Sequence, residues 1–331
     1  MIPFLKKFFQ PETFSKSSHY DGKQFFNLNV TPQKNFFDII KMLSSKEDKK
    51  WPKFIPLSIP SFSPVNLQDN EVNLTFINHA SFLIQLKNLT ILTDPIFSER
   101  AGPGGWLGPK RVRQAGIKFD ELPQVQVILI SHNHFDHMDM PSLIKLNKKF
   151  KPLFIVPLGN KKYLQKNAIQ NVIELDWWEK HTLNATQSIT IVPAQHWSRR
   201  SFMDTNAALW GGFWLTSQSL NIYFSGDTGY SDHFKNIHKT LGAPDISLLP
   251  IGAYLPEWFM RASHLNPEEA VLAHIDLKSK LSIAMHHRTF KLSHEEIDAP
   301  ASELLNSLKK HGIDIELFKI PENGDNIFYK K

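Results

Sequence analysis

The feature that most constrains the fold of this chain is an apolar run at residues 125–130 that ends at a cluster of histidines and aspartates. A continuous apolar run of this length is typical of a strand buried on both faces. Directly after it, His132, His134, Asp136 and His137 form the pattern H-x-H-x-D-H. Side chains on a turn at the end of a buried strand are held by a rigid scaffold and still reach an open cleft. The fold must therefore bury this strand in a covered sheet while its end opens into a site.

The pattern indicates metal binding. The chain has no cysteine, so any zinc or iron site must use histidine, aspartate or glutamate. Three histidines within six residues would be costly to bury without partners. We expect His132 and His134 to reach one metal ion, and Asp136 and His137 to turn toward a second.

Three other apolar runs also end at a residue of ligand type. These residues are His196, Asp227 and His286. A carboxylate that bridges two cations would hold them about 3.5–4 Å apart, as in two-metal hydrolases. His79 and His274 are interpreted as structural histidines because they lie in or beside predicted elements.

The remaining pattern predicts an α/β fold. Short strands are expected at residues 72–77, 81–86 and 89–94, and later in the chain strands alternate with helices. One helix has a clear start, with Asn266 as the N-cap, a proline at the first helical position and Glu269 completing a capping box. Such an arrangement predicts two sheets covered by helices.

Composition places the chain in the ordinary globular class. It has 331 residues, of which 41% are hydrophobic and 21% charged, which is enough for a large core. A net charge of +6 weakly favours anionic partners, although ordinary solubility explains it equally well. No apolar run approaches the roughly 18–20 residues of a membrane-spanning helix, and Lys6 and Lys7 interrupt the N-terminal apolar stretch. We therefore expect no signal peptide and a cytoplasmic or peripheral membrane location, with non-classical export left open.

Residues 1–70 are interpreted as an N-terminal extension. Prolines punctuate residues 51–65, which favours an irregular, extended chain. Leu5, Phe8 and Phe9 would share one helical face beside two lysines, as in a short membrane anchor. The extension is therefore expected to make membrane or dimer contacts, although a terminus that docks on its own domain explains the aromatics equally well.

Several longer blocks resemble one known family. The blocks "LTDPIFSERAGPGGWLGPKRVR", "LISHNHFDHMD", "QHWSRRSFMDTNAALWGGF", "GDTGY", "PIGAYLPEWFM" and "NPEEAV" are similar to the N-acylphosphatidylethanolamine-hydrolysing phospholipase D family, within the metallo-β-lactamase superfamily. They span roughly residues 73 to 300. The metal motifs are shared by the whole superfamily, whereas "DPIF" with "GPKR" and "PIGAY" with "WFM" are far more specific. The first 70 residues show no comparable match.

The resemblance implies a fold and a ligand set. Residues 71–331 would form an αββα sandwich of metallo-β-lactamase type, two facing sheets flanked by helices. Two zinc ions per chain are implied, one held by His132, His134, His196 and Asp227, the other by Asp136, His137, Asp227 and His286. Asp94 would support a metal-binding imidazole from behind. His264 matches a family histidine near the substrate phosphate, and with Asp227 it is expected to act in catalysis. His287 is a rival to His286, but the family motif places the ligand first.

The resemblance also implies a substrate. The expected reaction is phospholipase D-type hydrolysis of N-acylphosphatidylethanolamine, or a related glycerophospholipid, to phosphatidic acid and N-acylethanolamine. Expected substrate contacts are Arg199, Arg200, Phe135 and Tyr254, with a structural ion pair as the alternative for the arginines. The chain departs from the family pattern beside the site: Phe135 replaces a tyrosine, Ser263 replaces a glutamine, and His287–Arg288 replace an aromatic residue and a glycine. These departures leave the acyl chain and head group open.

Partners and alternatives follow from the same observations. A phospholipid membrane is the expected partner, contacted also by a glycine-rich loop with Lys110, Arg111 and Arg113, for which a solvated loop is the alternative. The family implies a homodimer. No nucleic acid is expected, because neither a large basic surface nor an RNA-gripping appendage is evident. The alternative functions are a soluble metal-dependent lactonase, phosphodiesterase or nuclease of the same fold, or a catalytically silent lipid-binding protein.

Overall fold

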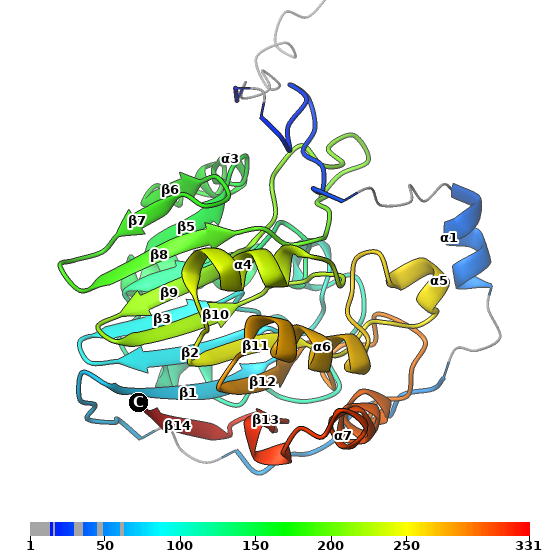
Figure 1. Ribbon diagram of the computed structural model, residues 1–331. Helices are drawn as coiled ribbons and strands as arrows, with labels where there is room; N and C mark the ends of the chain where they lie inside the picture. Colours follow the sequence, from blue (N-terminus) through cyan, green and yellow to red (C-terminus); the bar gives the residue numbers. More distant parts are fainter. Residues whose placement is uncertain (1–13, 16, 30–35, 45–48, 60–62) are drawn as a thin grey trace, which may run out of the picture.

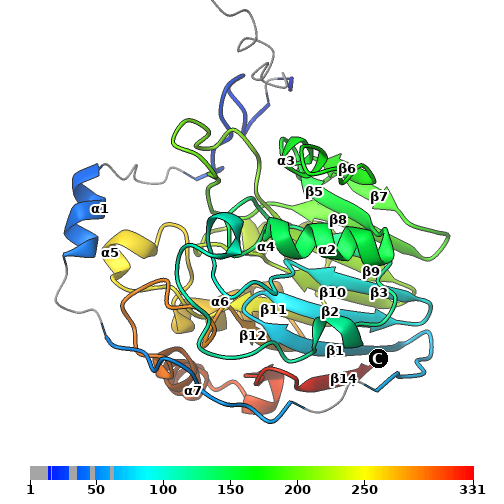
Figure 2. The ribbon, with the colours of Figure 1, turned by 180° about the vertical axis from the view of Figure 1, so that it is seen from behind.

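The computed structural model describes residues 14–15, 17–29, 36–44, 49–59 and 63–331. Two seven-stranded sheets face each other, and helices cover their outer faces, as Figures 1 and 2 show from opposite sides. The predicted α/β sandwich with two facing sheets and flanking helices is confirmed.

The first sheet mixes antiparallel and parallel neighbours. Its strand order is β14-β1-β2-β3-β4-β5-β6, antiparallel from β14 to β3 and parallel from β3 to β6. Its strands are β1 (Glu71–Asn78), β2 (Ser81–Leu86), β3 (Leu89–Thr93), β4 (Val127–Leu129), β5 (Leu153–Pro157), β6 (Val172–Leu175) and β14 (Asn326–Lys330).

The second sheet mirrors this plan. Its order is β13-β12-β11-β10-β9-β8-β7, parallel from β13 to β10 and antiparallel from β10 to β7. Its strands are β7 (Lys180–Thr182), β8 (Gln187–Val192), β9 (Gly212–Ser217), β10 (Leu220–Phe224), β11 (Ile246–Pro250), β12 (Leu281–Met285) and β13 (Phe318–Lys319).

Helices cover the two outer faces. In Figure 2 α2 lies across the first sheet, and in Figure 1 α4 and α6 lie across the second. The α-helices are α1 (Phe36–Leu43), α2 (Met140–Phe150), α3 (Lys161–Gln165), α4 (His233–Leu241), α5 (Glu257–Met260), α6 (Pro267–Leu277) and α7 (Ala299–His311), and short 3-10 turns lie at Pro103–Gly105, Phe119–Glu121 and Ile315–Leu317. The predicted capping box at the start of α6 is present, with Asn266 and Glu269 as its two members.

Alternation along the strands builds separate cores. In β2, Phe82 and Ile84 point between the sheets, whereas Leu83 points outward to the layer that packs under α2. In β10, Ile222 likewise points between the sheets and Tyr223 packs under α4 and α6. Because successive side chains of a strand point to opposite faces, a strand covered on both sides must be apolar throughout. This explains the continuous apolar runs of the sequence.

The strand directions bring several strand ends to one place. β1, β3 and β4 point the same way, because β2 is antiparallel to β1 and β3 while β4 is parallel to β3. In the second sheet β8, β10, β11 and β12 also share one direction. Residues that follow these strands therefore gather at one edge of each sheet.

Part of the segment interpreted as an extension packs into the core. Phe25 and Tyr20 are only 1% and 4% exposed and belong to the cluster between the sheets. On α1, by contrast, Phe37 is exposed. The proposed anchor residues 5–9 lie outside the described residues, and the boundary at residue 70 stays a prediction.

The glycine-rich loop presents fewer charges than expected. Arg111 and Arg113 are buried, Arg111 donating to the carbonyl oxygens of Ser98 and Ile96 and Arg113 pairing with Glu322. Buried guanidinium groups cannot meet lipid phosphates, so Lys110 is the basic residue of this set that remains at the surface. Within the described residues, no helix is both long and apolar enough to cross a membrane.

Candidate metal centre

The H-x-H-x-D-H segment forms a tight turn after β4. The backbone N–H groups of His137 and Met138 both donate to the carbonyl oxygen of His134, at 3.2 and 2.8 Å. This turn directs the imidazoles of His132, His134 and His137 to the same side, where the rings of His132 and His137 are 4.2 Å apart. The backbone of one short loop thus sets the spacing of the side chains.

One group of ligand atoms joins this loop to the loop after β8. His132 Nε2 lies 2.8 Å from His134 Nδ1, and His196 Nε2 lies 3.2 Å from the same atom. The far nitrogens are engaged by protein: His196 Nδ1 is 2.8 Å from the Ser263 carbonyl oxygen, and His132 Nδ1 is 2.9 Å from Ser131 Oγ. Such contacts fix which nitrogen faces the centre.

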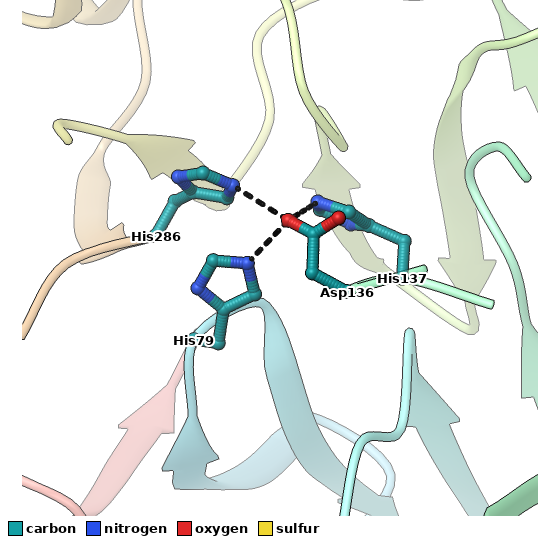
Figure 3. A group of neighbouring side chains, drawn as sticks. All are labelled: His79, Asp136, His137 and His286. Carbon is teal, nitrogen blue, oxygen red and sulfur yellow. Dashed lines mark hydrogen bonds and ion pairs between the residues drawn. The ribbon is translucent and has the colours of Figure 1, made fainter. Parts of the chain in front are cut away.

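A second group of side chains gathers around Asp136 (Figure 3). Asp136 Oδ2 is 3.3 Å from His137 Nε2, 3.5 Å from His286 Nε2 and 2.9 Å from His79 Nε2. The four residues come from β1, the H-x-H-x-D-H turn and the end of β12, so both sheets contribute. Their ligand atoms all lie within 4.8 Å of one another.

Asp227 lies between the two groups. Its Oδ2 is 3.1 Å from His137 Nε2 and 3.2 Å from His286 Nε2 on one side, and 3.9 Å from His196 Nε2 on the other. His264 Nδ1 is 3.8 Å from the same oxygen. One carboxylate therefore faces histidines of both groups, which is the position of a bridging ligand.

Asp94 supports the loop from behind. Its carboxylate accepts hydrogen bonds from His137 Nδ1 at 2.7 Å and from the Ser131 N–H at 2.7 Å. Asp94 is fully buried and follows β3 directly, with a backbone φ of 33°. Its carboxylate leaves His137 Nε2 as the ring nitrogen that faces the centre.

Burial and charge polarise the cluster. Burial lowers the pKa of His79 and His134 to about 3 and that of His196 to about 4, which keeps these rings neutral at physiological pH. Burial would also lower the pKa of His286, but Asp227 and Asp136 raise it to about 9. Burial would raise the pKa of Asp227, but the facing His137 and His286 hold it well below its usual value. Two buried carboxylates thus draw positive charge to the centre.

The residues fit a metal ion. Among the described residues, the Nε2 atoms of His137 and His286, which lie 3.1 and 3.2 Å from Asp227 Oδ2, are buried without a hydrogen bond of good geometry. Buried polar atoms are normally paired, so these ring nitrogens beside two carboxylates form a site that fits a cation. Imidazole nitrogens and carboxylate oxygens are donors that suit zinc or iron.

The comparisons with known proteins agree with this geometry. Residues 90–287 match the family model described as the β-lactamase superfamily domain. The chain belongs to the β-lactamase superfamily.

Two similar proteins are both named as phospholipases D. The chain is 39% identical over 252 residues to the mitochondrial N-acyl-phosphatidylethanolamine-hydrolyzing phospholipase D of Saccharomyces cerevisiae, covering 73% of this chain and 54% of the yeast protein. It is 36% identical over 234 residues to N-acyl-phosphatidylethanolamine-hydrolyzing phospholipase D 1 of Caenorhabditis elegans, covering 67% of this chain and 65% of the relative. The chain thus spans between about half and two thirds of the length of these relatives.

Solved structures share the fold. The metallo hydrolase Igni18 from Ignicoccus hospitalis has a TM-score of 0.60 at 19% identity, covering 79% of this chain and 99% of that protein. The isothiocyanate hydrolase from Delia radicum gut bacteria has a TM-score of 0.63 at 18% identity, covering 78% and 100%. The predicted metallo-β-lactamase type of sandwich is therefore confirmed.

The structure also places the residues expected to contact substrate. His264 is 12% exposed, more than the buried ligands beside it, so it lies at the rim of the superfamily site. Arg200 donates to the carbonyl oxygens of Asn133 and Met138 at 2.9 and 2.8 Å and stacks 4.3 Å above the Phe135 ring. This arginine holds the ligand loop, which is a structural role. It differs from the ion pair considered as the structural alternative.

The other two expected substrate contacts, Arg199 and Tyr254, pack against neighbouring protein groups. Arg199 lies over the Trp197 ring, with 5.7 Å between the guanidinium carbon and the ring centre. Tyr254 is only 2% exposed, and burial together with the Glu303 carboxylate raises the pKa of its hydroxyl. Little of Tyr254 is therefore accessible to a substrate.

Sequence reasoning left His79 as structural, and the structure places it in the second group (Figure 3). The signal was present, because His79 follows β1 as the other candidates follow their strands. Of the two rival histidines, His286 Nε2 lies 3.2 Å from Asp227 Oδ2, whereas the His287 ring stacks on Phe76 with 5.7 Å between ring centres. His274 lies outside these ligand groups and contacts Ser282 Oγ at 2.8 Å.

Proposed function

We propose that this chain is a zinc-dependent hydrolase of phospholipase D type. Its substrate would be N-acylphosphatidylethanolamine or a related glycerophospholipid, and its products phosphatidic acid and N-acylethanolamine. The observation that carries the proposal is Asp227, which faces histidines of both groups. The names of the yeast and worm relatives support the substrate class.

The residues present would hold two zinc ions. His132, His134, His196 and Asp227 would bind one, and Asp136, His137, His286 and Asp227 the other. Bound zinc supplies Lewis acidity, which polarises a phosphoryl oxygen and makes water acidic near neutral pH. Because the carboxylates of Asp136 and Asp227 lie among the imidazoles, the site supplies negative charge that favours a bound cation.

The chain's own residues would orient the reactants. Asp227 stays ionised at neutral pH because its pKa is held well below its usual value, so it can accept a hydrogen bond from the attacking water. His264, partly exposed beside Asp227, can donate to a phosphate oxygen of the substrate. Water would attack phosphorus, and the bond between phosphorus and the head-group oxygen would break, which releases the head-group alcohol.

A glycerophospholipid with at least two acyl chains stays in a bilayer, so we extend the proposal to a peripheral membrane protein. The loop that follows His196 supports this part of the proposal. Its residues Phe202 and Met203 are 98% and 95% exposed, far more than apolar side chains usually are in water. They closely follow Arg200, which donates to carbonyl oxygens of the H-x-H-x-D-H turn, so insertion of this loop would bring the site toward the lipid surface.

An activity panel tests the proposed function. Purified, zinc-loaded protein is incubated with vesicles containing N-acylphosphatidylethanolamine, with bis-p-nitrophenyl phosphate, with a lactone and with RNA. We expect release of N-acylethanolamine and close to two zinc ions per chain by elemental analysis. Asp227→Ala should lower both, whereas Asp120→Ala, an exposed aspartate outside the centre, should lower neither.

Other outcomes would overturn the proposal. Turnover of bis-p-nitrophenyl phosphate or lactone without lipid cleavage would indicate a soluble phosphodiesterase or lactonase. Cleavage of RNA would indicate a nuclease. Full lipid cleavage by metal-free protein would show that the reaction does not need the metal centre.

A further inference from the structure

The N-terminal segment 17–29 reaches the metal centre. It lies against the loop that follows β8, and its contact with a ligand residue is made by the side chain of Asn27. Asn27 Nδ2 donates to the His196 carbonyl oxygen at 2.9 Å, and the His196 N–H donates to Asn27 Oδ1 at 3.0 Å. One amide side chain therefore satisfies both backbone groups of a candidate ligand, as a neighbouring strand would do.

His196 lies where the sheet offers it no such neighbour. β8 ends at Val192, and the chain from there to β9 has no regular secondary structure. A buried backbone N–H and C=O without partners are costly, so the Asn27 amide stabilises the loop in this path. A further donor, Trp210 Nε1, contacts Asn27 Oδ1 at 3.1 Å and fixes the orientation of the amide.

The backbone and the ring of His196 are held independently. Asn27 holds the backbone, while the Ser263 carbonyl oxygen, 2.8 Å from Nδ1, holds the ring. Together they point Nε2 toward His134 Nδ1, 3.2 Å away. A ligand must be held to about 0.5 Å to bind a metal ion well, and either contact alone would leave the imidazole free to shift.

The segment is anchored well enough to act as a support. His19 Nε2 is 2.7 Å from Asp176 Oδ1, and the His19 ring stacks on Trp177 with 4.4 Å between centres. Gln24 Nε2 donates to the Thr205 carbonyl oxygen at 2.9 Å, and the Phe25 N–H donates to that of Asn206 at 2.8 Å. The same loop is thus contacted at His196 and again at its far end.

We propose that Asn27 is a positioning residue for the ligand His196, so that the N-terminal segment is part of the metal centre. The inference rests on the metal centre of the proposed function, but it makes no use of the lipid substrate. Loss of Asn27 would free the backbone of the loop at His196. The affinity for the ion that His132, His134 and His196 would hold should then fall. An ion held by Asp136, His137 and His286 would depend on residues that follow β4 and β12, so we expect it to be bound as before.

Metal titration of the full chain tests this. Metal-free protein is titrated with Zn²⁺ by calorimetry and with Co²⁺ by visible absorption, which reports the ligand geometry. For Asn27→Ala we expect the affinity for one of the two ions to fall about 10–100-fold, as when a supporting partner of a ligand is lost. Gln24→Ala, which removes an amide of the same segment that contacts Thr205, should bind both ions like the natural chain.

A second variant keeps the test decisive. Asn27→Asp retains the oxygen that accepts from His196 and Trp210 but places a carboxylate oxygen, which cannot donate, against the His196 carbonyl oxygen, so it should fold and still weaken the binding of one ion. Natural affinity for both ions in either folded variant would overturn the proposal. An equal loss in Gln24→Ala would also overturn it, because the effect would then come from docking of the segment. Since no lipid is present, failure of the proposed substrate would leave these results unchanged.

Discussion

At the scale of single residues, the second ligand group depends on a histidine that holds two ligands at once. The His79 carbonyl oxygen accepts from the His286 N–H at 2.7 Å, and its Nε2 contacts Asp136 Oδ2 at 2.9 Å. His286 and Asp136 follow strands of different sheets. His79 is fully buried with a backbone φ of 50°, a conformation that its surroundings must maintain. It therefore fixes the distance between a ligand of each sheet.

We predict that His79→Ala lowers the affinity for the proposed ion beside Asp136 by about 10–100-fold, because the Asp136 carboxylate loses the donor that orients it. His79→Gln keeps an N–H donor and should restore much of the affinity. The zinc content of both variants is measured after dialysis against increasing concentrations of a chelator. His274→Ala removes a buried histidine outside the centre and controls for the cavity. Full zinc retention in His79→Ala would contradict the prediction, and no rescue by Gln would show that the imidazole itself is a ligand.

Sequence reasoning reached most of the ligand groups because the placement of each residue is local. His196, Asp227 and His286 each follow an apolar strand, and parallel strands end at a shared edge. His79 obeys the same rule but sits in a two-residue connection between β1 and β2, where a polar residue is also typical of a turn. No local pattern distinguishes the two roles, since the partner Asp136 is distant in sequence.

At the scale of elements, apolar runs predicted the strands well. They gave no indication that the segment 17–29 packs against the rest of the chain. β1, β2 and β3 match the predicted residues to within one position, while β4 is shorter than its apolar run, which continues into the ligand loop. The segment 17–29 forms isolated bridges, a few backbone hydrogen bonds and side-chain hydrogen bonds, but no regular helix or strand. Such contacts leave no periodic signal in the sequence, so the docked segment could not be separated from an extension.

The loop after β8 is predicted to bind the membrane surface through Phe202 and Met203. Replacing Phe202 and Met203 together by serine should lower binding to anionic phospholipid vesicles at least about tenfold, because full burial of one such side chain contributes about 1.5–3 kcal/mol. Vesicle sedimentation measures this. Phe328→Ser removes an exposed aromatic from β14 and should leave binding unchanged. Equal vesicle binding by the double variant and the natural chain would exclude this loop as a membrane contact.

At the scale of the whole molecule, one buried carboxylate ties the two sheets together at their edge. Asp245 precedes β11 and is only 1% exposed, and it accepts hydrogen bonds from Lys280 Nζ and from Lys331 Nζ, both at 2.9 Å. Lys331 follows β14 of the other sheet, so the pair with Asp245 crosses the sandwich. Burial alone would raise the pKa of Asp245, but the contacts with Lys280, the Asn221 N–H and Lys331 lower it below its usual value.

This arrangement predicts how stability depends on pH. A carboxylate whose folded pKa is lowered contributes stability above its unfolded pKa of about 3.9, and that contribution is lost as the pH falls through the folded pKa. Asp245→Asn should therefore lower the free energy of unfolding by about 1.5–3 kcal/mol near neutral pH, toward the lower end because both lysines are partly exposed. The difference from the natural chain should narrow as the pH falls below about 4. Urea unfolding across this pH range measures it, with the exposed Asp120→Asn as the control, and a difference that stays constant into acid would show that the charge of Asp245 contributes nothing.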